Sequence, residues 1–415
     1  MPRAPVSARL HHAAPVTCVL TCSWLLLLVH AALAQKPAKP ASPRAMRTGP
    51  ERHHILRQPA GPTIRTTTDQ GKAINGGLPQ NCSLDSHLRK ARKGHLPLTS
   101  PPRTSTAWPV IDWEYWRPQW GRNWHKKGHL PQEVTGTLQL GTKHPSPRAS
   151  GAFYLYPDCH NYNHHERNYT GSCPLLESLR NDELLWMWNS STALFPSIAI
   201  RKSHANAVSN LHFSQYRVLE SLRIASLTAL DYDLPTFVYT RLGYRDEAMA
   251  FLTTKDLIHT IGESAALGAA GFVIWGDLNL TSSRHNCSRV KSFLGSRLGQ
   301  YITNVTRAAE VCSDFLCQSN GRCARRDSRA SHYLHLSSDS YRIEPSGDGE
   351  FAVTGWHSQR ELLLLANRFR CHCYQGYGGE RCDSLETPEE TKSAALRTGN
   401  SVVSVVLILI LNFII

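Results

Sequence analysis

Two acidic side chains, Asp112 and Glu114, stand two positions apart at the end of a short apolar run. In a strand, such residues point to the same face, with Cα atoms about 6.7 Å apart. Neighbouring carboxyl groups can split their pKa values, so that one remains a protonated acid while the other remains charged. The pair is therefore typical of glycoside hydrolysis. Because most Asp-x-Glu pairs are solvated surface groups, it needs support from the rest of the chain.

The elements that must hold this pair follow an alternating pattern along the chain. Strand-like runs occur at 151–156, 192–200, 235–240 and 272–275, and helix-like runs at 181–188, 216–229, 254–267 and 288–306. Strand–helix alternation of this length predicts an α/β fold with a parallel sheet or barrel.

The composition allows one large domain and a smaller one, since the chain has 415 residues and 41% hydrophobic content. The net charge of +14 suggests an acidic partner such as an anionic polysaccharide or membrane. Part of that excess lies in residues 35–72, a basic, Pro-rich segment that we expect to be disordered.

The N-terminus predicts a secretory route. Arg3 and Arg9 precede an apolar run that ends in Ala32-Leu33-Ala34, so residues 1–34 have the pattern of a cleaved signal peptide. An uncleaved anchor helix is the alternative. The twelve cysteines fall to ten once Cys18 and Cys22 leave with the signal, an even number that suits disulfides.

Six N-x-S/T triplets add to the secretory pattern and predict a glycoprotein. Because the compartment is oxidising and extracellular, we expect no nucleic-acid partner despite the basic charge. The expected glycosylation sites are Asn81, Asn168, Asn189, Asn279, Asn286 and Asn304.

The C-terminal segment 384–415 ends in an almost wholly apolar run from Val402 to Ile415, too short to span a bilayer core of roughly 30 Å as a helix. Small residues at Ser393-Ala394-Ala395 precede it, the order found in a GPI-attachment signal. A short membrane anchor or a loose tail is the alternative.

The cysteines after residue 311 form a pattern of their own. Cys371-x-Cys373 and Cys382, with glycines between them, match the C-terminal half of an EGF-like module, here at 312–383 with an insertion after Cys323. Metal binding is the rival interpretation, which oxidised, His-poor spacing disfavours. The expected pairs are Cys312–Cys323, Cys317–Cys371 and Cys373–Cys382.

Several long blocks together resemble the vertebrate hyaluronidases, glycoside hydrolase family 56, and most of all the GPI-anchored, sperm-surface type. The resemblance implies a distorted (β/α) TIM-like barrel at 73–311 followed by the EGF-like module. The blocks are Asp112–Pro118, Phe153–Cys159, Leu194–Ile198, Gly262–Gly271 and Trp275–Asp277.

The resemblance also implies a mechanism: substrate-assisted, retaining hydrolysis of β-1,4 N-acetylglucosaminide bonds in hyaluronan. Glu114 would protonate the leaving oxygen and later activate water, while the substrate's acetamido oxygen acts as nucleophile. Asp112 would hold the proton of Glu114 and help to stabilise the oxazolinium-like intermediate.

Further roles follow from the resemblance. Tyr154 would contact the acetamido group, unless it is a core tyrosine, and Trp275 would line the pocket. Arg217 would meet substrate carboxylates, with a structural ion pair as an equal alternative. Cys159–Cys173 matches a family disulfide. No cofactor is implied, and the histidines after Cys159 are better explained by a loop than by a metal site.

The chain also departs from the family pattern. Ala199 stands where the family has a tyrosine after Pro-Ser-Ile. The first barrel strand and its cysteine, expected before Gly76, and most of a helix before Phe153 are missing from the sequence pattern. Cys82 is then the substitute partner for Cys287.

Three functions remain in view at this point. The first is a monomeric, GPI-anchored hyaluronan hydrolase on the cell surface, with secreted or lysosomal location as the alternative. The second is a hydrolase of chondroitin, and the third is a catalytically inactive surface protein that binds glycosaminoglycans in adhesion.

Overall fold

The computed structural model describes the protein from residue 152 to 385, together with short pieces nearer the N-terminus. The expected signal peptide, GPI signal and Glu114 lie outside the described residues. The described residues are 54–57, 83, 85, 89, 109–112, 152–230, 232–276, 278–347 and 350–385.

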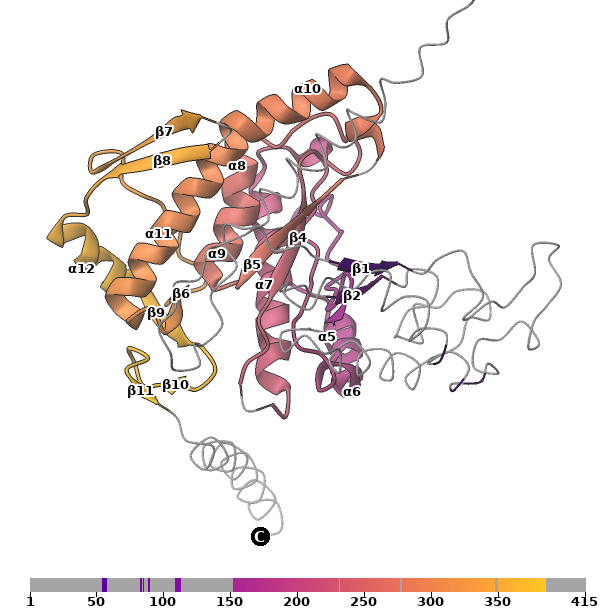
Figure 1. Ribbon diagram of the computed structural model, residues 1–415. Coiled ribbons are helices and arrows are strands. Elements are labelled where there is room, and N and C mark those ends of the chain that lie inside the picture. The colour runs from indigo at the N-terminus through magenta and orange to yellow at the C-terminus, as the bar shows by residue number, and fades with distance from the viewer. Residues whose placement is uncertain are drawn as a thin grey trace, which may run out of the picture.

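Parallel strands follow one another in chain order across the molecule (Figure 1). Strand β2 (Pro109–Asp112) pairs in parallel with β1 (His54–Arg57) on one side and with β3 (Ala152–Phe153) on the other. Strands β4 (Phe237–Arg241) and β5 (Gly271–Trp275) form a second parallel pair.

Isolated parallel bridges join these two sheets through the segment 194–197. Tyr154 pairs with Phe195, Leu194 with Thr236, and Ser197 with Tyr239. The described strands therefore run in the order of the chain, as in a singly wound α/β barrel, although the row does not close among these residues. The expected strand at 192–200 is reduced to these bridges.

Strand β1 corrects one expectation. Residues 35–72 were predicted to be disordered and to supply no first barrel strand, yet four of them, His54–Arg57, form β1 along the edge of β2. A strand this short, with only Ile55 and Leu56 as an apolar pair, shows no period that a sequence pattern can detect. The expected loss of a helix before Phe153 falls outside the described residues.

Helices connect the strands and cover them on the outside. The longest described helix, α7, begins at Val208 rather than near 216, because its first turns are held by polar contacts that apolar periodicity does not reveal. Asn210 Nδ2, for example, donates to the His204 carbonyl at 2.7 Å and to Asp256 at 3.1 Å. The connecting helices are α5 (Leu175–Asp182), α6 (Leu185–Trp188), η6 (Lys202–His204), α7 (Val208–Leu227), α8 (Thr254–Leu257), η7 (Ile258–Gly262) and α9 (Glu263–Leu267).

The expected helix at 288–306 is the middle of a longer, bent run of continuous helices, called here the α10–α11 rod. It begins with α10 (Arg284–Phe293), after the short η8 (Leu278–Thr281), and continues through the π-helical η9 (Leu294–Leu298) into α11 (Gly299–Cys317). Ser296 has non-helical φ and ψ inside η9, so the bend is a π-bulge at a Gly-Ser pair.

Apolar side chains between the strands and these helices form the core. The larger cluster lies between α7, β4, β5 and the α10–α11 rod and includes Val218, Val238 and Val305, all fully buried. A second cluster gathers Phe153, Tyr156 and Trp188 below β3. Burial of a side chain of this size contributes about 1.5–3 kcal/mol, so the two clusters fix the strand ends relative to the helices.

The cysteine-rich C-terminal part forms separate two-stranded sheets beside α11. Strand β6 (Gly321–Arg325) pairs antiparallel with β9 (Phe369–Cys373), and β10 (Tyr377–Gly378) with β11 (Ser384–Leu385). The insertion between β6 and β9 is a hairpin, β7 (Tyr341–Gly347) and β8 (Glu350–Gly355), followed by helix α12 (Gln359–Arg368). The disulfides Cys312–Cys323, Cys317–Cys371 and Cys373–Cys382 have the connectivity that the spacing predicts.

A buried ion pair joins this C-terminal part to the strand–helix part. Glu263 of α9 accepts from both terminal nitrogens of Arg325 of β6, and Gln215 Nε2 donates to the same carboxylate at 2.8 Å. The two charged side chains are at most 1% exposed. Breaking such a pair by removing one partner costs about 3–5 kcal/mol, so the two parts are firmly coupled.

Candidate active site

The predicted site residues gather at the carboxyl ends of the parallel strands. Asp112 ends β2, and the register that pairs Ile111 with Phe153 brings Tyr154 next to the end of that strand. Trp275 ends β5 and pairs with Arg241 at the end of β4. In parallel α/β folds, this edge is where ligands and catalytic side chains meet.

Three aromatic rings make contact at this edge. The Tyr154 ring meets the Tyr239 ring edge-on with centroids 4.8 Å apart, and it meets the Trp275 ring edge-on at 6.5 Å. Tyr154 and Tyr239 are buried, whereas Trp275 is half-buried. These contacts bring together two of the residues predicted from the sequence, Tyr154 and Trp275.

A cation and an unused donor complete the described part of the edge. The Arg241 guanidinium lies over the Trp275 ring, 4.5 Å from its centroid. The indole Nε1 of Trp275 is buried and has no hydrogen-bond partner among the described residues. A buried N–H without a partner costs free energy unless a ligand or water accepts from it.

The acidic pair itself is only partly described. The backbone of Asp112 forms the last residue of β2, while Glu114 lies outside the described residues. The geometry of the two carboxyl groups therefore remains the prediction made from their spacing.

Tyr239 and Arg241 were not predicted from the sequence. They lie two positions apart at the end of β4, the same spacing as Asp112 and Glu114, so alternation sends both side chains to one face. The signal that would have found them is therefore a polar i, i+2 pair at a strand end.

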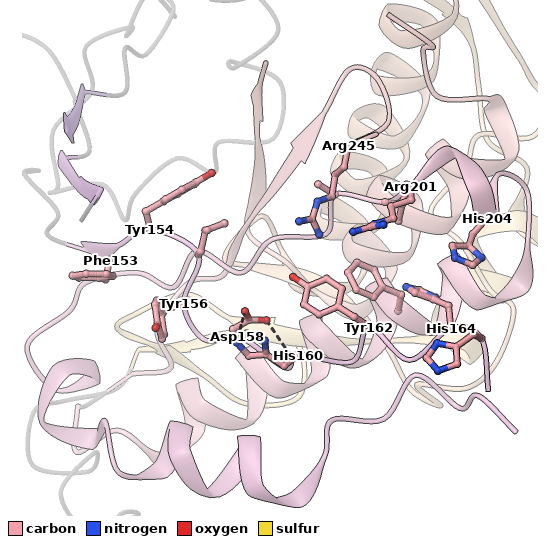
Figure 2. A pocket seen from close by; sticks show the side chains of 15 residues that line it. Phe153, Tyr154, Tyr156, Asp158, His160, Tyr162, His164, Arg201, His204 and Arg245 are labelled. Atoms are coloured by element: carbon pink, nitrogen blue, oxygen red, sulfur yellow. Dashed lines mark hydrogen bonds and ion pairs between the residues drawn. The ribbon is translucent and has the colours of Figure 1, made fainter. Parts of the chain in front are cut away.

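A cavity of about 540 Å³ opens beside these strand ends (Figure 2). Its walls include Tyr154 and Tyr156 from the end of β3, and Ala199 and Ile200 from the segment after the 194–197 bridges. Ala199, where the resemblance leads one to expect a tyrosine, presents only a methyl group to this space. Leu155, next to Tyr154, has φ 66°, a left-handed conformation that non-glycine residues seldom adopt outside functional turns.

Arg217 does not take the substrate-binding position that was one of its two predicted roles. It lies on α7 with its side chain 1% exposed, and its Nη2 forms an ion pair with Asp158 Oδ1 at 2.9 Å. Its Nε donates to Asn161 Oδ1 at 2.9 Å and its Nη1 to the Ser197 carbonyl at 3.0 Å. The alternative, a structural ion pair, is therefore correct, because these buried acceptors occupy the guanidinium.

Asp158 is held as a carboxylate by its neighbours. Burial alone would raise its pKa, but the charge of Arg217 and the hydrogen bonds from His160 outweigh burial and hold the pKa well below its usual range. His160 contributes its backbone N at 3.1 Å and its Nε2 at 3.0 Å. The Cys159–Cys173 disulfide, at the position that the resemblance implied, fixes the loop between them.

The remaining predicted cysteine pair is described on one side only. Cys287 is buried on α10 and disulfide-bonded, whereas Cys82 lies outside the described residues. Of the described residues, the only three with metal-ligating atoms close together are Cys317, Cys371 and Cys382, all of which belong to disulfides.

Comparison with known proteins agrees with this arrangement. The profile of the hyaluronidase family matches residues 62–134 and 132–386. Human hyaluronidase-4 is 49% identical over 378 residues, which is 83% of this chain and 78% of that protein. The hyaluronidase of the snake Crotalus adamanteus is 40% identical over 352 residues, covering 76% of this chain and 78% of its own.

A solved structure shares the fold. The crystal structure of bee venom hyaluronidase in complex with a hyaluronic acid tetramer matches with a TM-score of 0.55 and 23% identity, over 70% of this chain and 97% of that one. At this identity, the likeness concerns the fold alone.

Proposed function

The chain belongs to the hyaluronidase family, and on that premise we propose that it is an endo-glycosidase which hydrolyses β-1,4 N-acetylglucosaminide bonds in hyaluronan. The observation that carries the proposal is the meeting of Tyr154, Tyr239 and Trp275 at the strand ends, beside the strand that ends in Asp112. The half-buried ring of Trp275, held in place by the two buried tyrosines, is suited to packing against a sugar ring.

In the proposed mechanism, Glu114 donates a proton to the glycosidic oxygen as the bond to the anomeric carbon breaks. The acetamido oxygen of the same sugar attacks that carbon and forms an oxazolinium ion. Glu114, now a carboxylate, removes a proton from water, whose oxygen reopens the ring with net retention. Asp112 orients the proton of Glu114 and offsets the positive charge of the intermediate.

The aromatic cluster fits the demands of this mechanism. An acetamido group attacks its own anomeric carbon only when it is folded beneath the ring, and closely packed walls restrict it to that conformation. Tyr154 and Tyr239 would form these walls, with Trp275 Nε1 as a donor to the sugar. Arg241 would place a positive charge at the same edge.

We expect the unaltered protein to clear hyaluronan in a zymogram run at acid and at neutral pH. Glu114→Gln should remove clearing, because loss of a general acid/base lowers the rate by about 10²–10⁴-fold or more. Glu183→Gln, which changes an exposed glutamate before α6, is the matched control and should clear normally. No clearing by the unaltered chain would contradict the enzymatic proposal and favour a binding protein.

A parallel zymogram with unsulfated chondroitin tests the substrate assignment. Clearing of chondroitin with none of hyaluronan would replace the proposed substrate but keep the mechanism, because both polymers carry an N-acetylated sugar at the bond that breaks.

The rest of the chain suggests where this activity acts. We propose that residues 1–34 direct the chain into the secretory pathway, that 312–383 form an EGF-like module, and that 384–415 carry a GPI-attachment signal. In support, the disulfide connectivity matches that module, and Asn168, Asn189 and Asn279 are exposed. Within the described part of the chain, every helix is too short or too polar to cross a membrane.

A further inference from the structure

The cavity beside the strand ends has a second, cationic end that the proposed hydrolysis does not use. Figure 2 shows Arg201, Arg245, His164 and His204 gathered away from Tyr154. Arg201 and Arg245 are exposed, and neither forms an ion pair with a described residue. The one acidic residue in the wall, Asp158, is already engaged by Arg217 and His160.

Two loops are fastened together to form this end. The Arg245 backbone N donates to the Ile200 carbonyl at 2.9 Å, and the Lys202 backbone N donates to Asp246 Oδ1 at 2.7 Å. These bonds join the loop after β4 to the segment before α7, so Arg201 and Arg245 start from fixed backbone positions. The Arg245 guanidinium also lies 5.4 Å from the centroid of the Tyr162 ring.

Two histidines, His164 and His204, line the same end of the cavity as the two arginines. The His164 ring stacks on the His204 ring at 4.7 Å and packs against Phe213 at 5.2 Å. Burial, with the nearby charges of His204 and Arg217, lowers the pKa of His164 to about 4. Its Nδ1 is buried without a hydrogen-bond partner among the described residues.

Metal binding is not the chemistry of this cluster. Among the described residues, no three histidines bring their ligating nitrogens within 4.8 Å of one another. The charge of Arg201 acts on nearby Asp246, but neither Arg201 nor Arg245 has an ion-pair partner among the described residues. Two such guanidinium groups beside an imidazole with an unused nitrogen are instead suited to an anion with several oxygen acceptors.

We propose that the Arg201/Arg245 end of the cavity is an anion subsite that binds a carboxylate or sulfate ester of the polysaccharide, away from the bond that is hydrolysed. The inference rests on the proposed function for the identity of the polymer. Tyr154 and the two arginines line one continuous cavity, so one bound chain can contact both ends.

Binding to a hydrolysis-deficient protein tests the subsite directly. In a Glu114→Gln background, the affinity for a hyaluronan hexasaccharide is measured by isothermal titration calorimetry with and without Arg201→Gln/Arg245→Gln. We expect the double substitution to weaken binding about tenfold and to reduce its salt dependence, because two charge-assisted contacts are lost. The two single substitutions should each give part of the loss.

The matched control removes the same charge elsewhere. Arg307→Gln/Arg360→Gln alters exposed arginines on α11 and α12, neither of which lines this cavity. Melting temperatures of both double variants show whether either has lost its fold. Equal affinity of the two double variants for both the hyaluronan hexasaccharide and a sulfated chondroitin hexasaccharide would overturn the proposal.

The nature of the anion is read from further probes. If a carboxylate occupies the subsite, carboxyl-reduced hyaluronan hexasaccharide should bind equally to the protein with and without the arginines. If a sulfate ester occupies it, sulfated chondroitin hexasaccharide should lose more affinity on the arginine substitutions than its desulfated form. If neither carboxyl reduction nor desulfation of the hexasaccharide changes the effect of the arginine substitutions on affinity, the proposal is overturned.

Failure of the subsite and failure of the enzymatic proposal give different results. An unaltered chain that binds hyaluronan through Arg201 and Arg245 but clears none in a zymogram would refute hydrolysis and support the subsite. Normal clearing of hyaluronan, with an affinity that does not depend on these arginines, would support hydrolysis and refute the subsite.

Discussion

At the scale of single residues, burial separates side chains that the sequence treats alike. Arg217 and Arg241 are both arginines near the strand ends, yet Arg217 is fully enclosed, while Arg241 is half-buried and lies over Trp275 at the candidate site. When all the hydrogen-bond acceptors of a guanidinium group belong to the protein, the group holds the segments that carry those acceptors in position. The role of Arg217 is therefore to hold Asp158, Asn161 and the segment at Ser197 in place.

Replacement of Arg217 should affect stability before it affects substrate affinity. Arg217→Gln leaves Asp158 as a half-enclosed carboxylate without its partner, and we expect a loss of about 3–5 kcal/mol in the free energy of unfolding. Urea denaturation measures the loss, and Arg167→Gln, an exposed arginine in the same loop region, is the control. A raised KM with unchanged stability would restore the substrate-binding role.

At the scale of elements, β9 connects the C-terminal part to the strand–helix part through ionisable groups. His372 of β9 lies 4.0 Å from Asp233, in the segment before β4, and close to two arginines. Burial, together with the charges of Arg322 and Arg370, lowers the pKa of His372 to about 3. Burial raises the pKa of Asp233. As the pH falls, protonation of His372 therefore destabilises the fold, whereas protonation of Asp233 stabilises it.

The pH dependence of stability follows from the sign of these shifts. Because the pKa of His372 is lower in the folded state than the ordinary value of about 6.5, the unfolded chain binds more protons between those values. The stability that neutral His372 permits is complete above about pH 6.5 and is lost as the pH falls toward 3. Asp233 partly opposes this loss near its own, raised pKa.

His372→Gln isolates this contribution. We expect the variant to lose less stability than the unaltered protein when the pH is lowered from 7 to 4, by on the order of 1 kcal/mol after allowance for solvent screening. Melting curves at several pH values measure the difference, with His357→Gln, which lies before α12, as the control. Parallel curves for His372→Gln and the unaltered protein would show that His372 does not protonate on unfolding.

At the scale of the whole molecule, the described chain has two parts, and the proposed anchor would follow the second of them. The strand–helix part and the cysteine-rich part are coupled by the Glu263–Arg325 pair and by packing of β6 against α9 and α11. The two parts of the described chain therefore move as one unit.

A surface-expressed, tagged chain tests the anchor. Treatment of intact cells with phosphatidylinositol-specific phospholipase C should release most of the protein, because a GPI anchor is held only by its lipid chains. Deletion of residues 402–415 should send the protein into the medium instead. Retention on the cells after the lipase treatment would indicate another kind of attachment.

Much of this protein was decided locally and was therefore visible in the sequence. The alternation of strands and helices depends on residue types at fixed short spacings, which chain geometry converts directly into structure. The cysteine pairing followed from the EGF-like pattern, and Tyr154 and Trp275 from the family resemblance. The sequence blocks shared with the family also implied the barrel-like fold.

Only the tertiary structure decided which charged groups are enclosed and which remain open. The short β1 is a strand because β2 lies beside it, and Arg217 is structural because Asp158, Asn161 and Ser197 surround it. Arg245, distant in the sequence from Arg201 and His204, shares one cavity with them because two loops are hydrogen-bonded together. Burial and partnership depend on contacts between distant segments, and no local pattern of residues encodes them.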